Sequence, residues 1–192
     1  MRRECGELEQ FFTALNDIGV DGVMVGNLGT LKLARTLTKL PIQADHSFNL
    51  FNHLAATFLK ENGLTMATAS YELSFRQLRE IVENAVLPID AVVHGAYESM
   101  ICDYNFPAMS LPAYNDLDSP ELLDTHYAFR DEAGGVHSIR IDQYGRSHIY
   151  FAKDLCLYPY LEKFNGLGSY RIEAQDYTAD VTAEIVRIYR AA

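Results

Sequence analysis

Tryptophan is absent from the 192-residue chain, and cysteine occurs only three times, at Cys5, Cys102 and Cys156. Three widely spaced thiols form neither a disulfide framework nor a CxxC pair, which excludes a small secreted domain held together by disulfides. Long apolar runs are also absent, since no window contains the roughly 18 apolar residues that a membrane helix needs. No apolar segment follows Arg2 and Arg3, so we find no secretory signal and expect a cytoplasmic protein without a membrane partner.

Basic side chains are scarce as well. The chain has 16 Lys and Arg against 26 Asp and Glu, which gives a formal net charge of −10 and a pI near 5.0. A duplex-binding surface needs clustered Lys and Arg to displace the counterions of the phosphates. The basic residues are scattered here, so charge gives nucleic acid no support as a partner.

What the chain does contain is a regular alternation of short apolar strands and amphipathic helices. Such alternation, at intervals of roughly 20 to 25 residues, predicts βαβ units and a parallel sheet. The expected strands span residues 22–25, 42–47, 64–70, 88–95 and 169–174. The expected helices span residues 6–19, 27–41, 48–63, 73–85, 153–168 and 176–192.

Local signals refine this assignment. Ser74 and Gln77 form a capping-box signature, which predicts that a helix begins there. Residues 106–123 are rich in Pro, Asn, Asp and Ser and are expected to form a loop. Two alternating segments then flank the turn-rich spacer at 131–135, which predicts an antiparallel hairpin.

These elements predict one domain over residues 1–192. Four β/α units occupy 1–105, a loop and hairpin insertion occupies 106–152, and 153–192 hold a helix and the last β/α unit. About five units are too few for a closed eight-stranded barrel. Because the chain begins and ends inside a helix, we expect it to be a fragment of a longer protein.

Five segments, taken in order, resemble the collagenase-like peptidases of unknown catalytic type, peptidase family U32. The segments are LNDIGVDGVMVGNLGTLKLARTL, IQADHSFNLFNHLAATFLKENGLTMATASYELSFRQLREI, VVHG, DQYGRSHIYFAKDLCL and SYRIEAQDYTADVTAEIVRIYR. The resemblance covers nearly the whole chain. It implies an α/β fold, a partial TIM-like (β/α) barrel of about five β/α units with a β-hairpin inserted before the last unit.

The resemblance also implies a function. The nominal activity is peptide hydrolysis, with a peptide or small molecule as substrate. Other relatives resemble oxygen-independent hydroxylases, which modify RNA bases or a quinone precursor and use a four-cysteine iron–sulfur cluster. Glu98 and Asn105 stand where those relatives have the first two cluster cysteines, and residues 106–150 contain no cysteine, so no cofactor is expected in this chain. A hydroxylase with cysteines from elsewhere, and a non-catalytic remnant or pairing subunit, remain alternatives.

Candidate site residues follow from barrel geometry, since the C-terminal ends of barrel strands face the active site. Polar side chains at these ends are Asn27, Asp45, His46, Asn49, Glu72, His94 and Glu173. We expect Glu72, His94 and Glu173 to be catalytic: the glutamates as an acid/base pair with divergent pKa values and His94 as a general base. The alternatives are helix capping or an Arg partner for each glutamate, and a structural hydrogen bond or metal ligation for His94.

Two further residues are expected to bind substrate. Asn49 matches the residue type of the family, and Arg146 could clamp a carboxylate or phosphate bidentately. For Arg146 the alternative is an ion pair with Asp142 or Asp154. No metal site is expected, because the chain has no HExxH motif and no His pair at ligand spacing.

Cys102 lies eight residues after His94, so a thiol–imidazole pair is conceivable, although a free cysteine is more often a small apolar side chain. Two departures from the family pattern remove positive charges from the end of the barrel where the active site is expected. Tyr71 replaces an arginine, and residues 173–175 have the sequence Glu-Ala-Gln instead of Glu-Gly-Arg. The strand edges of an incomplete barrel invite pairing, so we also expect self-association or completion by the missing barrel strands.

Overall fold

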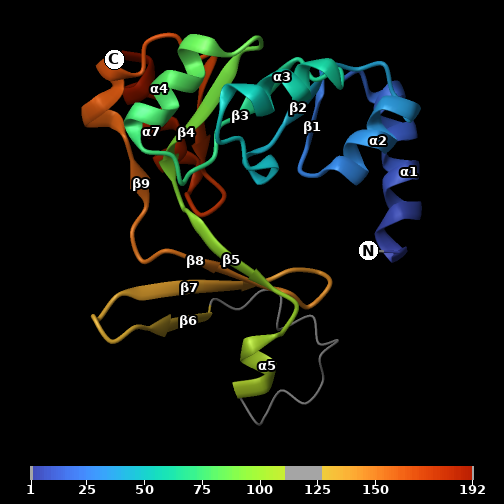
Figure 1. Ribbon diagram of the computed structural model, residues 1–192. Helices are drawn as coiled ribbons and strands as arrows, with labels where there is room; N and C mark the ends of the chain where they lie inside the picture. The colour runs from blue at the N-terminus through green and yellow to red at the C-terminus, as the bar shows by residue number, and fades with distance from the viewer. Residues whose placement is uncertain (1, 111–126, 192) are drawn as a thin grey trace. The chain divides into compact units, whose positions relative to one another are not determined.

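The computed structural model describes residues 2–110 and 127–191 (Figure 1). Five strands form a half-barrel sheet in the order β1-β2-β3-β4-β10, and the pairs β1–β2, β2–β3 and β3–β4 are parallel. The strands are β1 Val23–Val25, β2 Ile42–Ala44, β3 Met66–Thr68, β4 Ile89–Gly95 and β10 Ser169–Glu173. The helices are α1 Arg2–Ile18, α2 Leu28–Leu37, α3 His53–Glu61, α4 Phe75–Asn84 and α7 Ala179–Ala191. The predicted α/β fold and partial TIM-like barrel are therefore confirmed.

Each of the helices α2, α3 and α4 begins at a side chain that caps it. The Asn27 side chain accepts a hydrogen bond from the Thr30 amide at 2.9 Å, and the Asn52 side chain accepts one from the Ala55 amide at 2.8 Å. The predicted capping box is present at α4, where Ser74 and Gln77 bond each other's backbone amides. These bonds satisfy amide donors that a helix start otherwise leaves open.

Between helices and sheet, the core is built from small and branched apolar residues. Ala34, Ala44, Ala56 and Ala67 are each 0% exposed. Small side chains let the helices approach the strands closely, and larger residues such as Leu50 fill the remaining space. Three strands each carry a polar side chain that belongs to the candidate site described below: Gln43 on β2, Thr68 on β3 and Asp90 on β4.

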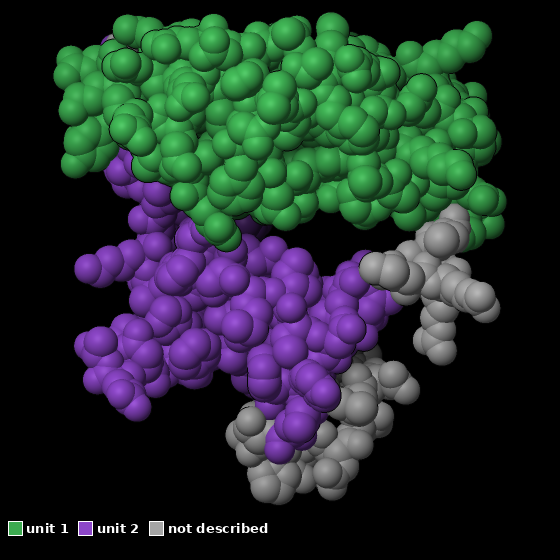
Figure 2. Space-filling model, in the orientation of Figure 1, with its two compact units in different colours: residues 1–93, 159–171 green, residues 94–158, 172–192 purple. Residues whose placement is uncertain are grey.

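The chain divides into two compact units (Figure 2). Unit 1 comprises residues 1–93 and 159–171, and unit 2 comprises residues 94–158 and 172–192. The boundaries fall inside β4 and β10, so unit 1 holds most of the parallel sheet. No helix among the described residues is long and apolar enough to cross a membrane.

Unit 2 contains a four-stranded antiparallel sheet in the order β5-β8-β7-β6. Its strands are β5 Glu98–Cys102, β6 Tyr127–Arg130, β7 Val136–Ile141 and β8 Ser147–Tyr150. β6 and β7 are the predicted hairpin around residues 131–135, which is confirmed. A small core of Ile139, Ile141 and Ile149 holds the sheet together, with Phe106 and Tyr127 packed against it.

Two segments differ from the sequence-based expectation. Residues 98–102 form strand β5, which pairs with β8, and this strand is not among those expected from the sequence. The predicted helix over 153–168 is instead strand β9 (Leu155–Cys156), which pairs with the end of β4, followed by the 3₁₀ helix η2 (Tyr158–Lys163). Pro159 lacks an amide hydrogen and cannot donate the hydrogen bond that a continuous α-helix from residue 153 would need at this position.

The predicted loop over residues 106–123 is described only in part. Its first residues form the short helix α5 (Phe106–Ser110), and residues 111–123 lie outside the described residues.

Candidate functional site

The polar centre of unit 1 lies where strand β2 ends. Asp45 directly follows β2, and its backbone amide donates to the Val25 carbonyl at 2.9 Å, which anchors it to the end of β1. Asp45 Oδ1 accepts a hydrogen bond from Arg171 Nη1 on β10 at 2.5 Å and lies 3.0 Å from His46 Nδ1. One carboxylate oxygen is thus shared by a guanidinium and an imidazole.

This setting fixes the charge of Asp45. Burial raises the pKa of its carboxyl group, but the hydrogen bonds and charges of His46 and Arg171 outweigh burial, so the pKa lies far below its ordinary value. Asp45 is therefore ionised at neutral pH. Arg171 is held in turn by Asp45 and by a 3.1 Å contact between its Nη1 and Met24 Sδ.

The ionised carboxylate also orients His46. A carboxylate can only accept hydrogen bonds, so His46 Nδ1 must carry a proton that it donates to Asp45. Nε2 is then the basic nitrogen of the neutral ring. The ring packs against Tyr71, with centroids 4.3 Å apart, and 24% of the side chain remains exposed. His46 thus has the orientation of a general base held by a carboxylate.

A second carboxyl group lies on the same sheet. Gln43 Nε2 on β2 donates to Asp90 Oδ2 on β4 at 2.7 Å, and Asp90 is only 3% exposed. Burial raises the pKa of Asp90, and neighbouring Thr68 and Arg171 offset this only in part. Unit 1 therefore contains two carboxyl groups, Asp45 and Asp90, whose pKa values are moved in opposite directions by their surroundings.

Asp90 and its strand neighbour Thr68 also retain unused polar atoms. Thr68 pairs with Asp90 in the β3–β4 register. Among the described residues, neither Asp90 Oδ1 nor Thr68 Oγ1, both buried, has a hydrogen-bond partner of good geometry. Buried polar atoms of this kind are commonly satisfied by an internal water.

The other predicted residues of unit 1 lie on loops near these strand ends. Asn49 adopts a left-handed conformation (φ 53°), and its amide closes the turn by donating to the His46 carbonyl at 2.9 Å. Glu72 is exposed, and its side chain does not cap α4, because Ser74 and Gln77 do. The catalytic role of Glu72 and the binding role of Asn49 stay predictions.

His94 and Glu173 both belong to unit 2. His94 Nδ1 lies 3.2 Å from the Tyr189 hydroxyl, so the structural hydrogen bond considered for this histidine is present. Gly95 has φ +124°, and a Cβ there would collide with the Glu173 carbonyl. The absence of a side chain at Gly95 therefore lets the Glu173 backbone pack directly against it. The structure brings His94 and Glu173 into one part of unit 2, and their catalytic roles stay predictions.

Arg146 lies in the turn between β7 and β8. Its Nε donates to Asp142 Oδ2 at 2.7 Å, so the ion pair considered as the alternative to substrate binding is formed. Asp142 also accepts the amides of Tyr144 and Arg146, each at 2.9 Å. Substrate binding by Arg146 stays a prediction.

The described residues do not fit a four-cysteine cluster. Cys102 lies on β5 and Cys156 on β9, in different sheets. The side chain of Glu98, which stands at an expected cluster position, is hydrogen-bonded to His148 Nδ1. In the described part of the chain, no three His, Cys, Asp or Glu side chains are grouped so that they could hold a metal ion. We therefore derive no reaction step through such a cluster.

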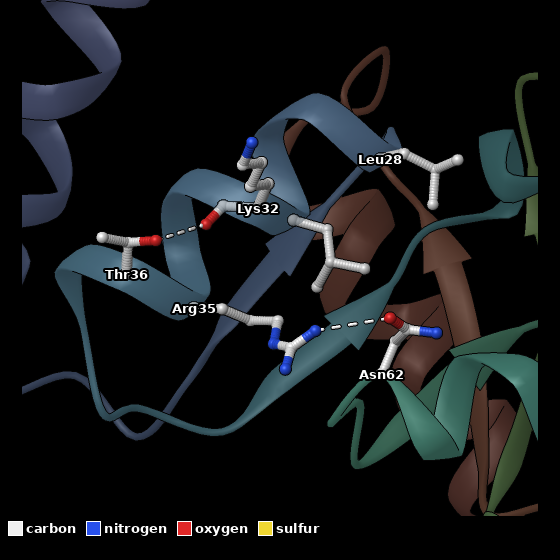
Figure 3. A pocket seen from close by; sticks show the side chains of 6 residues that line it. Leu28, Lys32, Arg35, Thr36 and Asn62 are labelled. Atoms are coloured by element: carbon white, nitrogen blue, oxygen red, sulfur yellow. Dashed lines mark hydrogen bonds between the residues drawn. The ribbon is translucent and has the colours of Figure 1, made fainter.

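A surface hollow of about 410 Å³ lies between α2 and the end of α3 (Figure 3). Lys32 and Arg35 project from α2 on one side, and Arg35 Nη1 donates to Asn62 Oδ1 at 3.3 Å. None of the predicted site residues lines this hollow. It is a shallow cationic groove on the helical side of unit 1, separate from the Asp45 centre.

Sequence reasoning missed Arg171 and Asp90. Arg171 lies two residues before Glu173, so strand alternation places both side chains on one face, and this periodicity could have identified it. Asp90 interrupts an apolar strand, and a carboxyl group in such a run indicates a buried polar site. The search covered the C-terminal ends of the strands and the residues that follow them, which excluded both.

Comparison with known proteins gives consistent similarities. The model of peptidase family U32 matches residues 1–105, more than half of the chain. The chain is 27% identical to the uncharacterized protease MJ0090 of Methanocaldococcus jannaschii, over 97% of its own length and 47% of that protein. It is 23% identical to tRNA hydroxylation protein P2 of Bacillus subtilis, over 97% of the chain and 62% of that protein.

A third relative is tRNA hydroxylation protein P1 of Bacillus subtilis, 26% identical over 95% of the chain and 44% of that protein. The chain thus spans about half the length of the curated relatives it matches. Among solved structures, the U32 peptidase Mk0906 aligns with 47% of this chain and 38% of its own, at 18% identity and a TM-score of 0.40.

Proposed function

The chain belongs to peptidase family U32, and from that premise we propose that it contributes the acid–base centre of an enzyme that hydrolyses peptide bonds. One observation carries the proposal: the ionised Asp45 holds His46 so that Nε2 is its basic nitrogen, and Arg171 secures that carboxylate. The cytoplasmic location expected from the sequence, and the pairing or completion of the open sheet, are part of the same proposal.

In this proposal His46 Nε2 takes a proton from a water molecule as that water attacks the substrate carbonyl. The imidazolium that forms is stabilised by Asp45, which stays ionised because Arg171 keeps its pKa low. Positioned general bases of this kind contribute about 10²- to 10⁴-fold to a rate. Asp90 is too deeply buried to touch a substrate and acts as a positioning residue through its hydrogen bond from Gln43 on β2, two strands away in the sheet.

The test is peptide cleavage by the longest natural chain that contains this sequence. His46→Gln should lower kcat by about 10²-fold or more, because the base is lost while the fold is kept. His53→Gln, on the first residue of α3, is the matched control and should leave kcat unchanged. An unchanged kcat in His46→Gln would refute the assignment, and loss of activity in Glu72→Gln, His94→Gln or Glu173→Gln would favour those residues instead.

A second function is favoured by two relatives that are named as tRNA hydroxylation proteins. Deleting the protein from its host and measuring hydroxylated nucleosides in total tRNA separates the two functions. A missing hydroxylated base, restored by the wild type and by His46→Gln alike, would support tRNA hydroxylation over peptide hydrolysis. The net charge of −10 argues that such a protein needs a further RNA-binding surface.

A further inference from the structure

The Cys156 thiol in unit 2 lies close to an imidazole and a phenol, those of His94 and Tyr189. Cys156 on β9 is exposed and forms no disulfide. In the antiparallel β4–β9 ladder it stands directly opposite His94. Side chains directly opposite each other in such a ladder have Cβ atoms about 4.5 to 5.5 Å apart. The sequence had suggested Cys102 as the thiol partner of His94, and the strand pairing selects Cys156 instead.

The third member of the cluster is Tyr189 on α7. Its hydroxyl group lies 3.2 Å from His94 Nδ1, and it also hydrogen-bonds the Cys156 sulfur. Tyr189 is 8% exposed, and its ring meets the rings of His94 and Tyr158 edge to face, each at 5.5 Å between centroids. The phenol is therefore held in place by aromatic packing rather than by the thiol alone.

The Tyr189 phenol can act as a hydrogen-bond donor within the cluster. Burial raises the pKa of the Tyr189 phenol, and the negative charge of Cys156 and the hydrogen bond to its sulfur raise it further. The phenol consequently keeps its proton and donates to the sulfur when the thiol ionises. The nearest acidic side chain on the same segment, Asp154, is bound by the Tyr177 hydroxyl, whose ring lies 6.0 Å from that of His94.

We propose that Cys156 is a reactive thiol that forms mixed disulfides with low-molecular-weight disulfides, with Tyr189 and His94 stabilising its thiolate. In this step the Cys156 thiolate attacks one sulfur of the disulfide, a new S–S bond forms and the old one breaks. The other half leaves as a thiolate and takes a proton from solvent. The disulfide supplies the oxidising equivalents, so no other co-reactant is needed.

Reactive cysteines occupy partly exposed positions beside groups that stabilise the thiolate. Cys156 is exposed and stands opposite His94, whose Nδ1 lies 3.2 Å from the Tyr189 hydroxyl. Cys102 provides a control within the same unit: it is only partly accessible and lies on β5, opposite Ser147 rather than opposite an imidazole.

The experiment measures the reaction of the folded chain with 4,4′-dithiodipyridine, a neutral disulfide, at pH 7, and locates the modified cysteines by peptide mass spectrometry. Cys156 should react at least about tenfold faster than Cys102, and faster in the folded chain than in chain unfolded by urea. Tyr189→Phe should slow the Cys156 reaction about tenfold through loss of one hydrogen bond to the thiolate. Cys102→Ser should leave the rate at Cys156 unchanged.

Two outcomes overturn the proposal. One is a Cys156 rate equal to that of Cys102, and the other is a Cys156 rate that does not fall on unfolding in urea. The second comparison needs no variant, so it decides the matter even where Tyr189→Phe does not fold.

Discussion

The two units differ in charge as much as in topology. Unit 1 has 10 Lys and Arg against 12 Asp and Glu, whereas unit 2 has six against 14, so formal net charges of −2 and −8 make up the total of −10. Unit 1 ties its central charges together, as at Asp45 and Arg171, on a parallel sheet. Unit 2 combines an antiparallel sheet with surplus carboxylates and aromatic contacts around His94. The acid–base centre proposed above lies in the nearly neutral unit, and the thiol cluster lies in the acidic one.

The largest effect on folding is expected at Gly95, the last residue of β4. Gly95→Ala should destabilise the chain by about 3 kcal/mol or more, because the backbone is left-handed there and the Cβ meets the Glu173 carbonyl. Gly134→Ala is the matched control: φ is +88° but the surrounding space is open, so the cost should be about 1 kcal/mol. Urea unfolding monitored by circular dichroism measures both, and equal losses would contradict the structure at Gly95.

A smaller loss is expected when the central ion pair of unit 1 is broken. Arg171→Met leaves the half-buried Asp45 carboxylate without its guanidinium, which should cost about 2 to 4 kcal/mol in the free energy of unfolding. Arg187→Met on α7 in unit 2 removes an exposed pair with Glu184 and should have no measurable effect. Equal urea midpoints for the two variants would contradict the expectation that the half-buried pair stabilises the fold more than the exposed pair.

The smallest expected effects are the pH dependences of the two aspartates, which have opposite signs. Because the pKa of Asp45 is lowered on folding, its contribution to stability is present above the ordinary aspartate pKa near 3.8 and is lost as the pH falls through the folded value. Because the pKa of Asp90 is raised, its contribution is present below 3.8 and is lost as the pH rises through the folded value.

Asp90→Asn keeps a neutral hydrogen-bonding side chain at all pH values. The variant should therefore remove a fall in stability that the wild type shows as the pH rises above the ordinary aspartate pKa near 3.8. Urea midpoints measured at several pH values test this, with Asp103→Asn, on the loop after β5, as an exposed control. A stability profile of Asp90→Asn that is parallel to the wild type would show that folding does not raise the pKa of Asp90.

The regular part of the chain was predictable because local signals and tertiary contacts agree. The capping box at Ser74 and Gln77, the apolar strand ending at His94 and the turn at 131–135 each gave the correct element. Unit 2 was less predictable: β5 pairs with β8, about 50 residues away, and its own residues alternate weakly. A strand that owes its existence to a distant partner leaves little trace in its own sequence.

The candidate site was predictable only at strand ends. Asp45 and His46 were selected because they lie at the end of an expected strand, yet the catalytic roles were assigned to Glu72, His94 and Glu173. No local signal shows that Arg171 reaches Asp45 from a strand 126 positions away. The pairing of Cys156 with His94 was not predicted either, because the sequence favoured a helix over residues 153–168. The structure has the two-residue strand β9 there, and β9 pairs with the distant strand β4. Contacts between residues far apart in the sequence form both the Asp45 centre and the Cys156 cluster.

The tautomer of His46 tests the central claim most directly. Two-bond ¹⁵N–¹H correlation spectra of the folded chain above the titration of its histidines report which ring nitrogen carries the proton. The account predicts a single His46 tautomer protonated on Nδ1, which becomes a mixture in Asp45→Asn. A wild-type His46 protonated on Nε2 would show that Asp45 does not hold the ring, and the proposed general base would be lost.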